Sequence, residues 1–167
     1  FWAEVWMSLI DTHCHLTFEP LADDVPAVLE RSRQAGVTAW ITVGTSLSDS
    51  RKAVELAGRY DNLFASVGIH PHDAKEAGDE ALAELEALAD HHKVVAVGET
   101  GLDFNRMFSP QKDQEHWLRR QLDIADDLDL PLIFHERDSE GRFLEILRER
   151  YPNGRKGVVH CFSGTRE

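Results

Sequence analysis

Short apolar stretches alternate with longer amphipathic stretches along this chain of 167 residues. The apolar stretches are rich in valine, isoleucine, leucine and aromatic residues, and their length is typical of buried strands. The amphipathic stretches between them have the length and patterning of helices. The pattern predicts strands at 8–15, 38–44, 63–70, 94–99, 131–136 and 157–162, and helices at 21–35, 48–60, 78–92, 110–129 and 138–150.

Several predicted helix ends contain residues that favour a boundary. Ser48 and Asp79 are predicted N-caps, because their side chains can accept hydrogen bonds from free backbone amides of the first turn. Ser109 precedes Pro110, and proline suits the first position of a helix. Gly36 suits a helix end.

Alternation of strands and helices implies a parallel sheet. Six such strands could form an open doubly wound sheet or part of a TIM-like (β/α)8 barrel. No glycine-rich dinucleotide loop follows the first predicted strand, whereas chemically active residues lie at the ends of nearly all of them. Active sites of barrels gather at these strand ends, and a complete barrel needs about 250 residues. We therefore expect an α/β fold of the barrel type, truncated to about six β/α units.

The composition is that of an ordinary globular domain, with 42% hydrophobic and 29% charged residues. Two cysteines are too few for a disulfide framework, and no apolar run is long enough for a membrane span. Residues 1–6 lack the features of a signal peptide. We interpret them as an upstream or non-native extension before a partial barrel domain at 7–167, and we expect a cytoplasmic protein.

The net charge of −12 argues against a broad basic surface for nucleic acid. Many of the acidic residues fall on predicted helix exteriors, at 79–90 and 123–130, where a solvated face is the simplest interpretation. A local site for nucleic acid remains compatible with this charge, because bound cations would supply positive charge where it is needed.

Metal-binding residue types recur at every second position in the stretch LIDTHCHL. Side chains of a strand alternate between its two faces, so Asp11, His13 and His15 should share one face. Two histidines in this arrangement can bind one metal ion. Cys14 then points the other way as a packing residue, and the same reasoning predicts that Cys161 faces the helices. Both thiols should be free.

Further candidates follow other predicted strands. Glu99 comes directly after an apolar run, and its carboxylate can bridge two cations, one oxygen to each. Gly98 and Gly101 beside it leave the backbone free to approach a ligand closely. His135 and His160 each stand at the end of a strand. One such histidine is more often structural, but the agreement of several strand ends is hard to attribute to chance.

Taken together, the motifs resemble those of the TatD-like metal-dependent deoxyribonucleases, which belong to the amidohydrolase-like barrel superfamily. The matching motifs are DTHCHL, VGIHPH, GETGLDF, SPQ, RRQLDIADDLDLPLIFHERD and HCFSG, in the family's order and at its spacing. The resemblance implies an eight-stranded barrel with a site for two divalent metal ions. It covers roughly the first two-thirds of a family member, and the family places one further metal-binding aspartate on a later strand.

The resemblance also implies which residues bind these ions. His13 and His15 would hold the first ion, His135 and His160 the second, and Glu99 would bridge the two. Two cations about 4 Å apart can clamp both oxygens of an in-line phosphoryl displacement and lower the pKa of a bound water. The mixed nitrogen and oxygen ligands suit Mg, Mn or Zn.

Other polar residues are compatible with more than one role. His70 and His72 could hold a phosphate oxygen, protonate a leaving group, or act only as supporting hydrogen-bond partners. Arg137 suits a phosphate, because its guanidinium is a fork of donors. Asp11 and Asp103 could orient the neighbouring ligands.

These observations predict a metal-dependent hydrolase that cleaves DNA phosphodiester bonds, and the resemblance implies a 3′–5′ exodeoxyribonuclease acting on a 3′ end or a single strand. The same metal pair could instead hydrolyse a small ester, lactone or amide, or the chain could be a non-catalytic, truncated metal-binding fragment. No predicted strand ends in a lysine that could be carboxylated, which favours the phosphodiester. Because six strands leave two open sheet edges, we also expect weak or no activity, one retained metal ion and self-association through the edges.

Overall fold

The computed structural model describes residues 8–150 and 156–165, so the predicted extension at 1–6 lies outside the described residues. Six strands form one sheet whose order follows the chain, and each neighbouring pair is parallel. A doubly wound sheet would reverse its strand order, so this topology is that of a barrel. The strands are β1 (Leu9–Cys14), β2 (Val37–Val43), β3 (Leu63–Val67), β4 (Val94–Asp103), β5 (Leu132–Arg137) and β6 (Gly157–His160).

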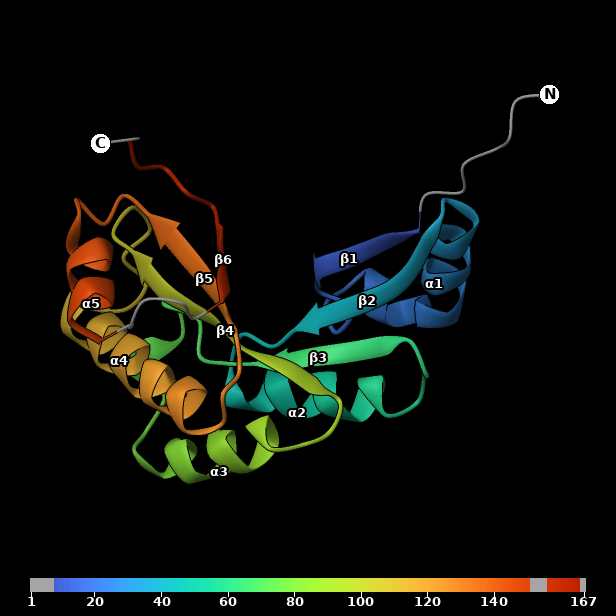
Figure 1. Ribbon diagram of the computed structural model, residues 1–167, viewed down its shortest axis with the longest axis horizontal. Coiled ribbons are helices and arrows are strands. Elements are labelled where there is room, and N and C mark those ends of the chain that lie inside the picture. Colours follow the sequence, from blue (N-terminus) through green and yellow to red (C-terminus); the bar gives the residue numbers. More distant parts are fainter. Residues whose placement is uncertain (1–7, 151–155, 166–167) are drawn as a thin grey trace.

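Five α-helices connect these strands within the described residues, and they lie along the outer side of the curved sheet (Figure 1). The first lies beside β1 and β2, the second and third below β3, and the last two beside β4 and β5. The barrel-type α/β fold is thereby confirmed, with six parallel strands in a curved sheet and five α-helices between them in the described residues. The helices are α1 (Val25–Gln34), α2 (Leu47–Ala57), α3 (Glu80–Ala89), α4 (Gln111–Asp127) and α5 (Arg142–Arg150), with short 3-10 helices at Leu21–Asp24 and Ala74–Glu76.

The helix starts differ in part from the prediction. Ser46, not Ser48, is the N-cap of α2, because its hydroxyl accepts a hydrogen bond from the amide of Asp49 at 3.2 Å. Asp79 occupies the N-cap position of α3 without a side-chain hydrogen bond. Pro110 precedes α4 as its cap residue instead of occupying its first turn.

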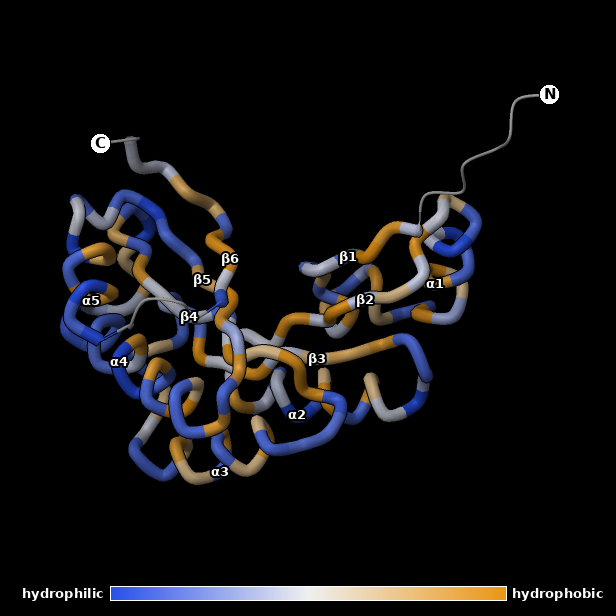
Figure 2. The backbone as a smooth tube through the Cα atoms, viewed as in Figure 1, coloured by the Kyte–Doolittle hydropathy of each residue, from blue (hydrophilic) through white to orange (hydrophobic). Residues whose placement is uncertain are grey.

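The main hydrophobic core lies between the sheet and the helices. It combines strand residues such as Trp40 and Leu63 with helix residues such as Leu85, Leu118 and Ile146. Figure 2 shows the origin of this core, since the strands are largely hydrophobic whereas the helices alternate between hydrophobic and hydrophilic residues. Each fully buried large apolar side chain contributes about 1.5–3 kcal/mol. The helices therefore cover one face of the sheet and leave the carboxyl ends of the strands to polar groups.

The two outer strands of the sheet, β1 and β6, each pair with a single neighbour among the described residues. Large apolar side chains are exposed on both, namely Leu9 and Ile10 on β1 and Val158 and Val159 on β6. Self-association through these edges stays a prediction. In the part of the chain that the structure describes, no helix is both long and apolar enough to span a membrane.

Candidate metal centre

Glu99 lies within β4 and not at its end, because the strand continues to Asp103. The pairing of β4 with β5 advances three residues on β4, from Val97 to Thr100, where β5 advances only two. This irregularity is a β-bulge, a feature that re-aims a side chain. The carboxylate of Glu99 is thereby directed among histidines, and the residue is only 3% exposed.

The two glycines beside Glu99 serve the packing of the strands. Gly98 and Gly101 have φ angles of +134° and +148°, a region that residues with a side chain rarely adopt. A Cβ atom at Gly98 would overlap the carbonyl oxygen of Ile133, and one at Gly101 would overlap that of His135. The close approach expected to a ligand is therefore an approach to the backbone of β5.

The two carboxylate oxygens of Glu99 face two different groups of histidines. Oε2 lies 3.3 Å from Nε2 of His13 and 3.9 Å from Nε2 of His15. Oε1 lies 3.0 Å from Nδ1 of His135 and 3.9 Å from Nε2 of His160. The structure therefore brings together all five residues that the sequence predicted as metal ligands.

On the β1 side, the backbone fixes the proton on one histidine. Nδ1 of His15 donates to the carbonyl oxygen of Val43 at 3.2 Å, so its Nε2 carries a lone pair. That Nε2 lies 3.3 Å from Nε2 of His13. Asp11 contacts the backbone of this strand, since its Oδ1 accepts from the amide of His13 at 3.2 Å. A second bulge between Asp11 and Cys14 interrupts the strict alternation assumed for β1.

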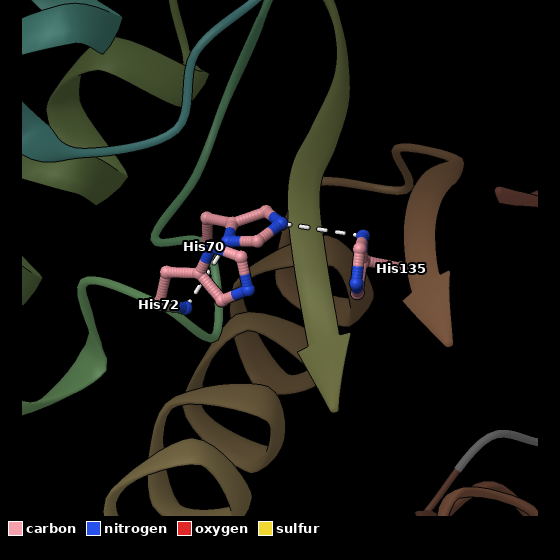
Figure 3. A group of neighbouring side chains, drawn as sticks. All are labelled: His70, His72 and His135. Carbon is pink, nitrogen blue, oxygen red and sulfur yellow. Dashed lines mark hydrogen bonds between the residues drawn. The ribbon is translucent and has the colours of Figure 1, made fainter. Parts of the chain in front are cut away.

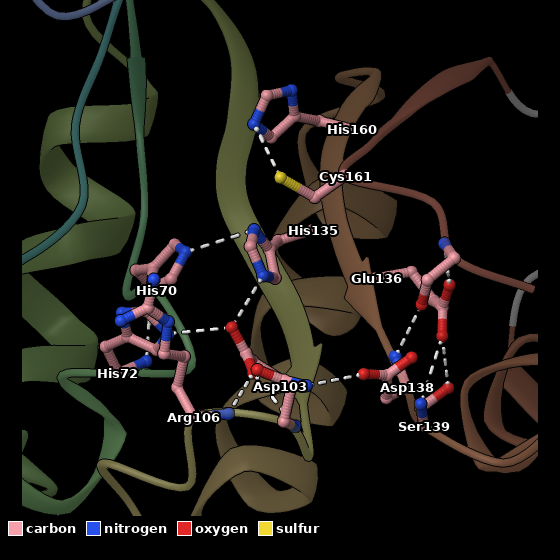
Figure 4. Close-up of polar contacts among 12 residues, drawn as sticks. His70, His72, Asp103, Arg106, His135, Glu136, Asp138, Ser139, His160 and Cys161 are labelled. Atoms are coloured by element: carbon pink, nitrogen blue, oxygen red, sulfur yellow. Dashed lines mark hydrogen bonds and ion pairs between the residues drawn. The ribbon is translucent and has the colours of Figure 1, made fainter.

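On the β5 side, Asp103 fixes the proton on the other histidine. Its Oδ2 accepts from Nε2 of His135 at 3.1 Å (Figure 4). Nδ1 of that ring therefore carries the lone pair and faces Oε1 of Glu99 at 3.0 Å. Oδ1 of Asp103 accepts from the amides of Asn105 and Arg106 at 3.1 and 2.7 Å. The carboxylate is thus held in one orientation, which supports the predicted orienting role of Asp103.

Electrostatics favour an ionised Glu99. Burial alone would raise the pKa of this carboxyl, but its contacts with His13 and His135 hold it well below its usual range. Burial likewise acts to lower the pKa of His135, and its contact with Glu99 raises it instead. A buried carboxylate and histidine lone pairs that converge on it require positive charge between them. The donor set therefore fits a bound cation on each side of Glu99.

His70 also lies near this carboxylate, but its proton is on the other nitrogen. The amide of His72 donates to Nδ1 of His70 at 3.0 Å, so Nε2 of His70 carries a hydrogen (Figure 3). That Nε2 points to Nδ1 of His135 at 3.2 Å and lies 3.8 Å from Oε1 of Glu99. Burial lowers the pKa of His70 to about 3, so the ring stays neutral. In this tautomer His70 is a hydrogen-bond donor to the site, although its ring also forms a group with His72 and His135 that could hold a metal ion.

The loop that carries His70 follows β3 and is held by a side chain of α4. Gln121 is fully buried and forms hydrogen bonds with both the amide and the carbonyl of Ile69, at 2.8 and 3.1 Å. Its Nε2 also donates to the hydroxyl of Thr100 on β4 at 2.7 Å. One amide side chain thus sets the position of His70 relative to β4 and its carboxylate.

His72 and Arg137 differ in how the structure places them. Nε2 of His72 donates to Oδ2 of Asp103 at 2.8 Å, the oxygen that also accepts from His135. Arg137 ends β5 and is partly exposed. Within residues 8–150 and 156–165, no hydrogen bond or ion pair joins its guanidinium to these groups, so its role stays a prediction.

A cavity of about 410 Å³ opens beside these histidines, and aromatic rings that the sequence analysis missed help to line it. Phe18 stacks on His15 with ring centroids 4.9 Å apart, and Phe108 meets His72 edge-on at 4.8 Å. Both rings are largely exposed, at 43% and 53%. They lie in connections between strands and helices, where no periodic pattern marks them.

The two cysteines lie in contrasting environments, and both are free. Cys14 is as predicted: its thiol donates to the carbonyl of Ile41 at 3.3 Å beside the core, and burial raises its pKa to about 12. The prediction for Cys161 was wrong, because that residue is exposed and its Sγ lies 3.2 Å from Nε2 of His160. The strand ends at His160, so alternation no longer sets the direction of the next side chain.

The fold and the site together define a protein of the α/β barrel class with a candidate metal centre at the carboxyl ends of its strands. The chain belongs to the TatD family, since residues 10–167 match the family described as TatD related DNase. It is 42% identical over 159 residues to a Cronobacter sakazakii protein named 3′-5′ ssDNA/RNA exonuclease TatD, a match that covers 95% of this chain and 60% of that protein. This chain thus spans about 60% of the length of such relatives.

Solved structures agree with this membership. A TatD homologue from Escherichia coli is 36% identical with a TM-score of 0.83, over 94% of this chain and 61% of that one. A TatD family hydrolase from Entamoeba histolytica is 32% identical with a TM-score of 0.86, over 95% and 59%. A phosphotriesterase homology protein from Escherichia coli, at 14% identity and a TM-score of 0.60, shares the fold.

Proposed function

We propose that this chain forms the metal-binding part of a nuclease that hydrolyses phosphodiester bonds of single-stranded DNA from the 3′ end with two divalent metal ions. The observation that carries the proposal is the position of Glu99, whose two oxygens face separate histidine groups. The names of the curated relatives, exonucleases of single-stranded DNA and RNA, support the phosphodiester over a small ester, lactone or amide. The cytoplasmic location stays a prediction.

The ligands would divide between the two sides of Glu99. His13 and His15 would hold one ion, and His135 and His160 the other, with one oxygen of Glu99 for each. Bound Mg, Mn or Zn ions would supply an activated water and stabilise negative charge on the leaving oxygen.

The other residues of the site would bind and orient the substrate. His70 presents a fixed, neutral N–H group, which suits a phosphate oxygen and cannot act as an acid at neutral pH. Nε2 of His72 is engaged by Asp103, which leaves Nδ1 as the nitrogen that exchanges a proton with the substrate. Arg137 would act on phosphates further along the strand.

The aromatic rings at the cavity favour a single-stranded substrate. Bases of a single strand bind proteins by stacking on exposed aromatic side chains, and each stacked base contributes about 1–3 kcal/mol. Phe18 is exposed beside His15, which would hold a metal ion, and Phe108 is exposed beside His72, which would exchange a proton with the substrate. Such rings would hold the bases next to the scissile bond without a basic groove, which agrees with a net charge of −12.

The test compares two substrates in the intact protein loaded with Mn²⁺. Phe108→Ala should raise KM for a 3′-labelled oligonucleotide by about tenfold, because one stacking contact is lost. It should leave the hydrolysis of bis(p-nitrophenyl) phosphate unchanged, since that small diester needs only the metal centre. The exposed Leu144 on α5 offers the control Leu144→Ala, which should change neither substrate. Hydrolysis of the small diester without any hydrolysis of oligonucleotides would contradict the proposed nuclease.

A further inference from the structure

We propose that Cys161 is an additional ligand for the metal ion beside His135 and His160, and that its thiolate makes this position selective for thiophilic ions such as Zn²⁺. The proposal rests on the metal centre proposed above and deepens it. It assigns unequal chemistry to the two halves of the site, which their histidines alone do not distinguish.

The spacing of the three side chains fits one ion. Ligand atoms of His135, His160 and Cys161 all lie within 4.8 Å of one another. In a tetrahedral zinc site, Zn–S bonds of about 2.3 Å and Zn–N bonds of about 2.0–2.1 Å separate sulfur and nitrogen by about 3.5 Å. Sγ of Cys161 lies 3.2 Å from Nε2 of His160, so a small adjustment suffices.

The turn that directs this thiol is fixed by contacts with the connection after β5. Cys161 has a φ angle of +55°, which turns the chain away from the strand direction directly after His160. Two residues later, the amide of Ser163 donates to Oε2 of Glu136 at 3.2 Å, and its hydroxyl accepts from the amide of Asp138 at 2.7 Å. Glu136 itself is buried and also binds Ser139. The contacts of Ser163 thus hold the turn that places the thiol of Cys161 beside His160, in addition to the hydrogen bond between the thiol and His160.

The two sides of Glu99 then differ in softness. The group beside β1 consists of His13, His15 and Glu99, with nitrogen and oxygen ligands that suit Mg²⁺ and Mn²⁺ as well as Zn²⁺. A thiolate on the other side favours zinc and other soft ions and disfavours magnesium. Cys14 follows His13 in the same dipeptide, but its thiol points to the carbonyl of Ile41 on the other side of the strand. It therefore provides a matched control.

The experiment titrates Co²⁺ into the parent chain and into the variants Cys161→Ser and Cys14→Ser. Visible d–d bands report that the ion is bound, and a near-ultraviolet charge-transfer band reports a cobalt–thiolate bond. We expect both signals in the parent and in Cys14→Ser, and only the visible bands in Cys161→Ser. The ratio of Zn²⁺ to Mn²⁺ affinity should fall by at least about tenfold in Cys161→Ser, because the variant removes the thiolate ligand that favours Zn²⁺.

The outcomes separate this proposal from the one it rests on. Visible bands without a charge-transfer band in the parent would show a metal centre that lacks the thiolate, which overturns the role of Cys161 alone. A charge-transfer band that persists in Cys161→Ser would overturn it too. No cobalt signal of either kind in the folded parent chain would overturn the metal centre and the thiolate ligand together.

Discussion

The two sides of Glu99 hold their histidines by different means. On the β1 side, His13 lies on the strand and His15 directly follows its end, and the backbone carbonyl of Val43 fixes the proton of His15. On the other side, His135 and His160 come from two neighbouring strands, and a carboxylate, that of Asp103, fixes the proton of His135. The first arrangement depends on the main chain, whereas the second depends on a side chain that substitution can change.

This difference would affect how strongly each side of Glu99 binds its metal ion. A carbonyl oxygen is neutral, whereas an ionised carboxylate adds negative charge behind its histidine and makes that ring a stronger ligand. Asp103 also binds His72 through the same oxygen, so one carboxylate links the ligand to the residue assigned to proton transfer. The β5 side should therefore respond to substitutions in its surroundings more than the β1 side.

The largest effect is expected from Glu99→Gln, which removes the group that the two sides share. Loss of a bridging negative charge should release at least one of the two ions from the intact protein. Hydrolysis of oligonucleotides should fall by at least about a thousandfold, since metal ions contribute several kcal/mol of charge stabilisation. Metal content by atomic absorption and turnover on a 3′-labelled oligonucleotide measure the two effects.

A matched control is Glu145→Gln, which alters an exposed carboxylate on α5. Circular dichroism should show both variants folded. Turnover by Glu99→Gln within a few-fold of the parent would refute the bridging role of Glu99. It would show that the two histidine groups bind their metal ions without a shared carboxylate.

A smaller and one-sided effect is expected from Asp103→Asn. The amides of Asn105 and Arg106 would retain the carbonyl oxygen of the new side chain and turn its NH2 group toward His135. That NH2 donates, so the proton of His135 would move to Nδ1 and block the lone pair that faces Glu99. Mn²⁺ affinity on this side should fall about 10–100-fold.

Calorimetric titration of Mn²⁺ measures this change and separates it from the β1 side. The ion held by His13 and His15 should keep its affinity, because the hydrogen bond between His15 and the carbonyl of Val43 is unchanged. An equal loss of Mn²⁺ affinity for both ions would show that Asp103 stabilises the fold of the whole site. It would contradict a role limited to fixing the proton of His135 on Nε2.

The two sides also differ in how far the sequence predicts them. The spacing of His13 and His15 predicts that they meet on one side, although a bulge between Asp11 and Cys14 interrupts the alternation that this prediction assumed. The parallel order of the strands follows from the alternation of strands and helices. The approach of His135 and His160 to Glu99 depends on the bulge in β4 and on the register between strands. Local sequence patterns do not determine the register between strands. The prediction that His135 and His160 converge on Glu99 therefore depended on the family resemblance.

Details that depend on single hydrogen bonds were beyond the sequence. The thiols of Cys14 and Cys161 follow histidines in the same dipeptide, yet one faces the helices and the other faces the site. The proton positions on His15 and His70 depend on which backbone group each ring meets. The exposed rings of Phe18 and Phe108 lie in loops, where no hydrophobic periodicity predicts the position of a side chain.

The smallest effect concerns His70, which lies near Oε1 of Glu99 and donates toward His135. Asparagine at this position would place an oxygen where Nδ1 lies, keep the hydrogen bond from the amide of His72 and remove the Nε2–H donor. Glutamine would instead place an N–H group near Nε2. A hydrogen bond to a charged group contributes about 1.5–3 kcal/mol, so His70→Asn should lower turnover by about tenfold or more while both metal ions stay bound. His70→Gln should lower turnover much less.

Turnover and metal content of the two variants check the assignment. Equal losses in both would show that the ring of His70 acts through packing, whereas loss of a metal ion from His70→Asn would show that it is a ligand.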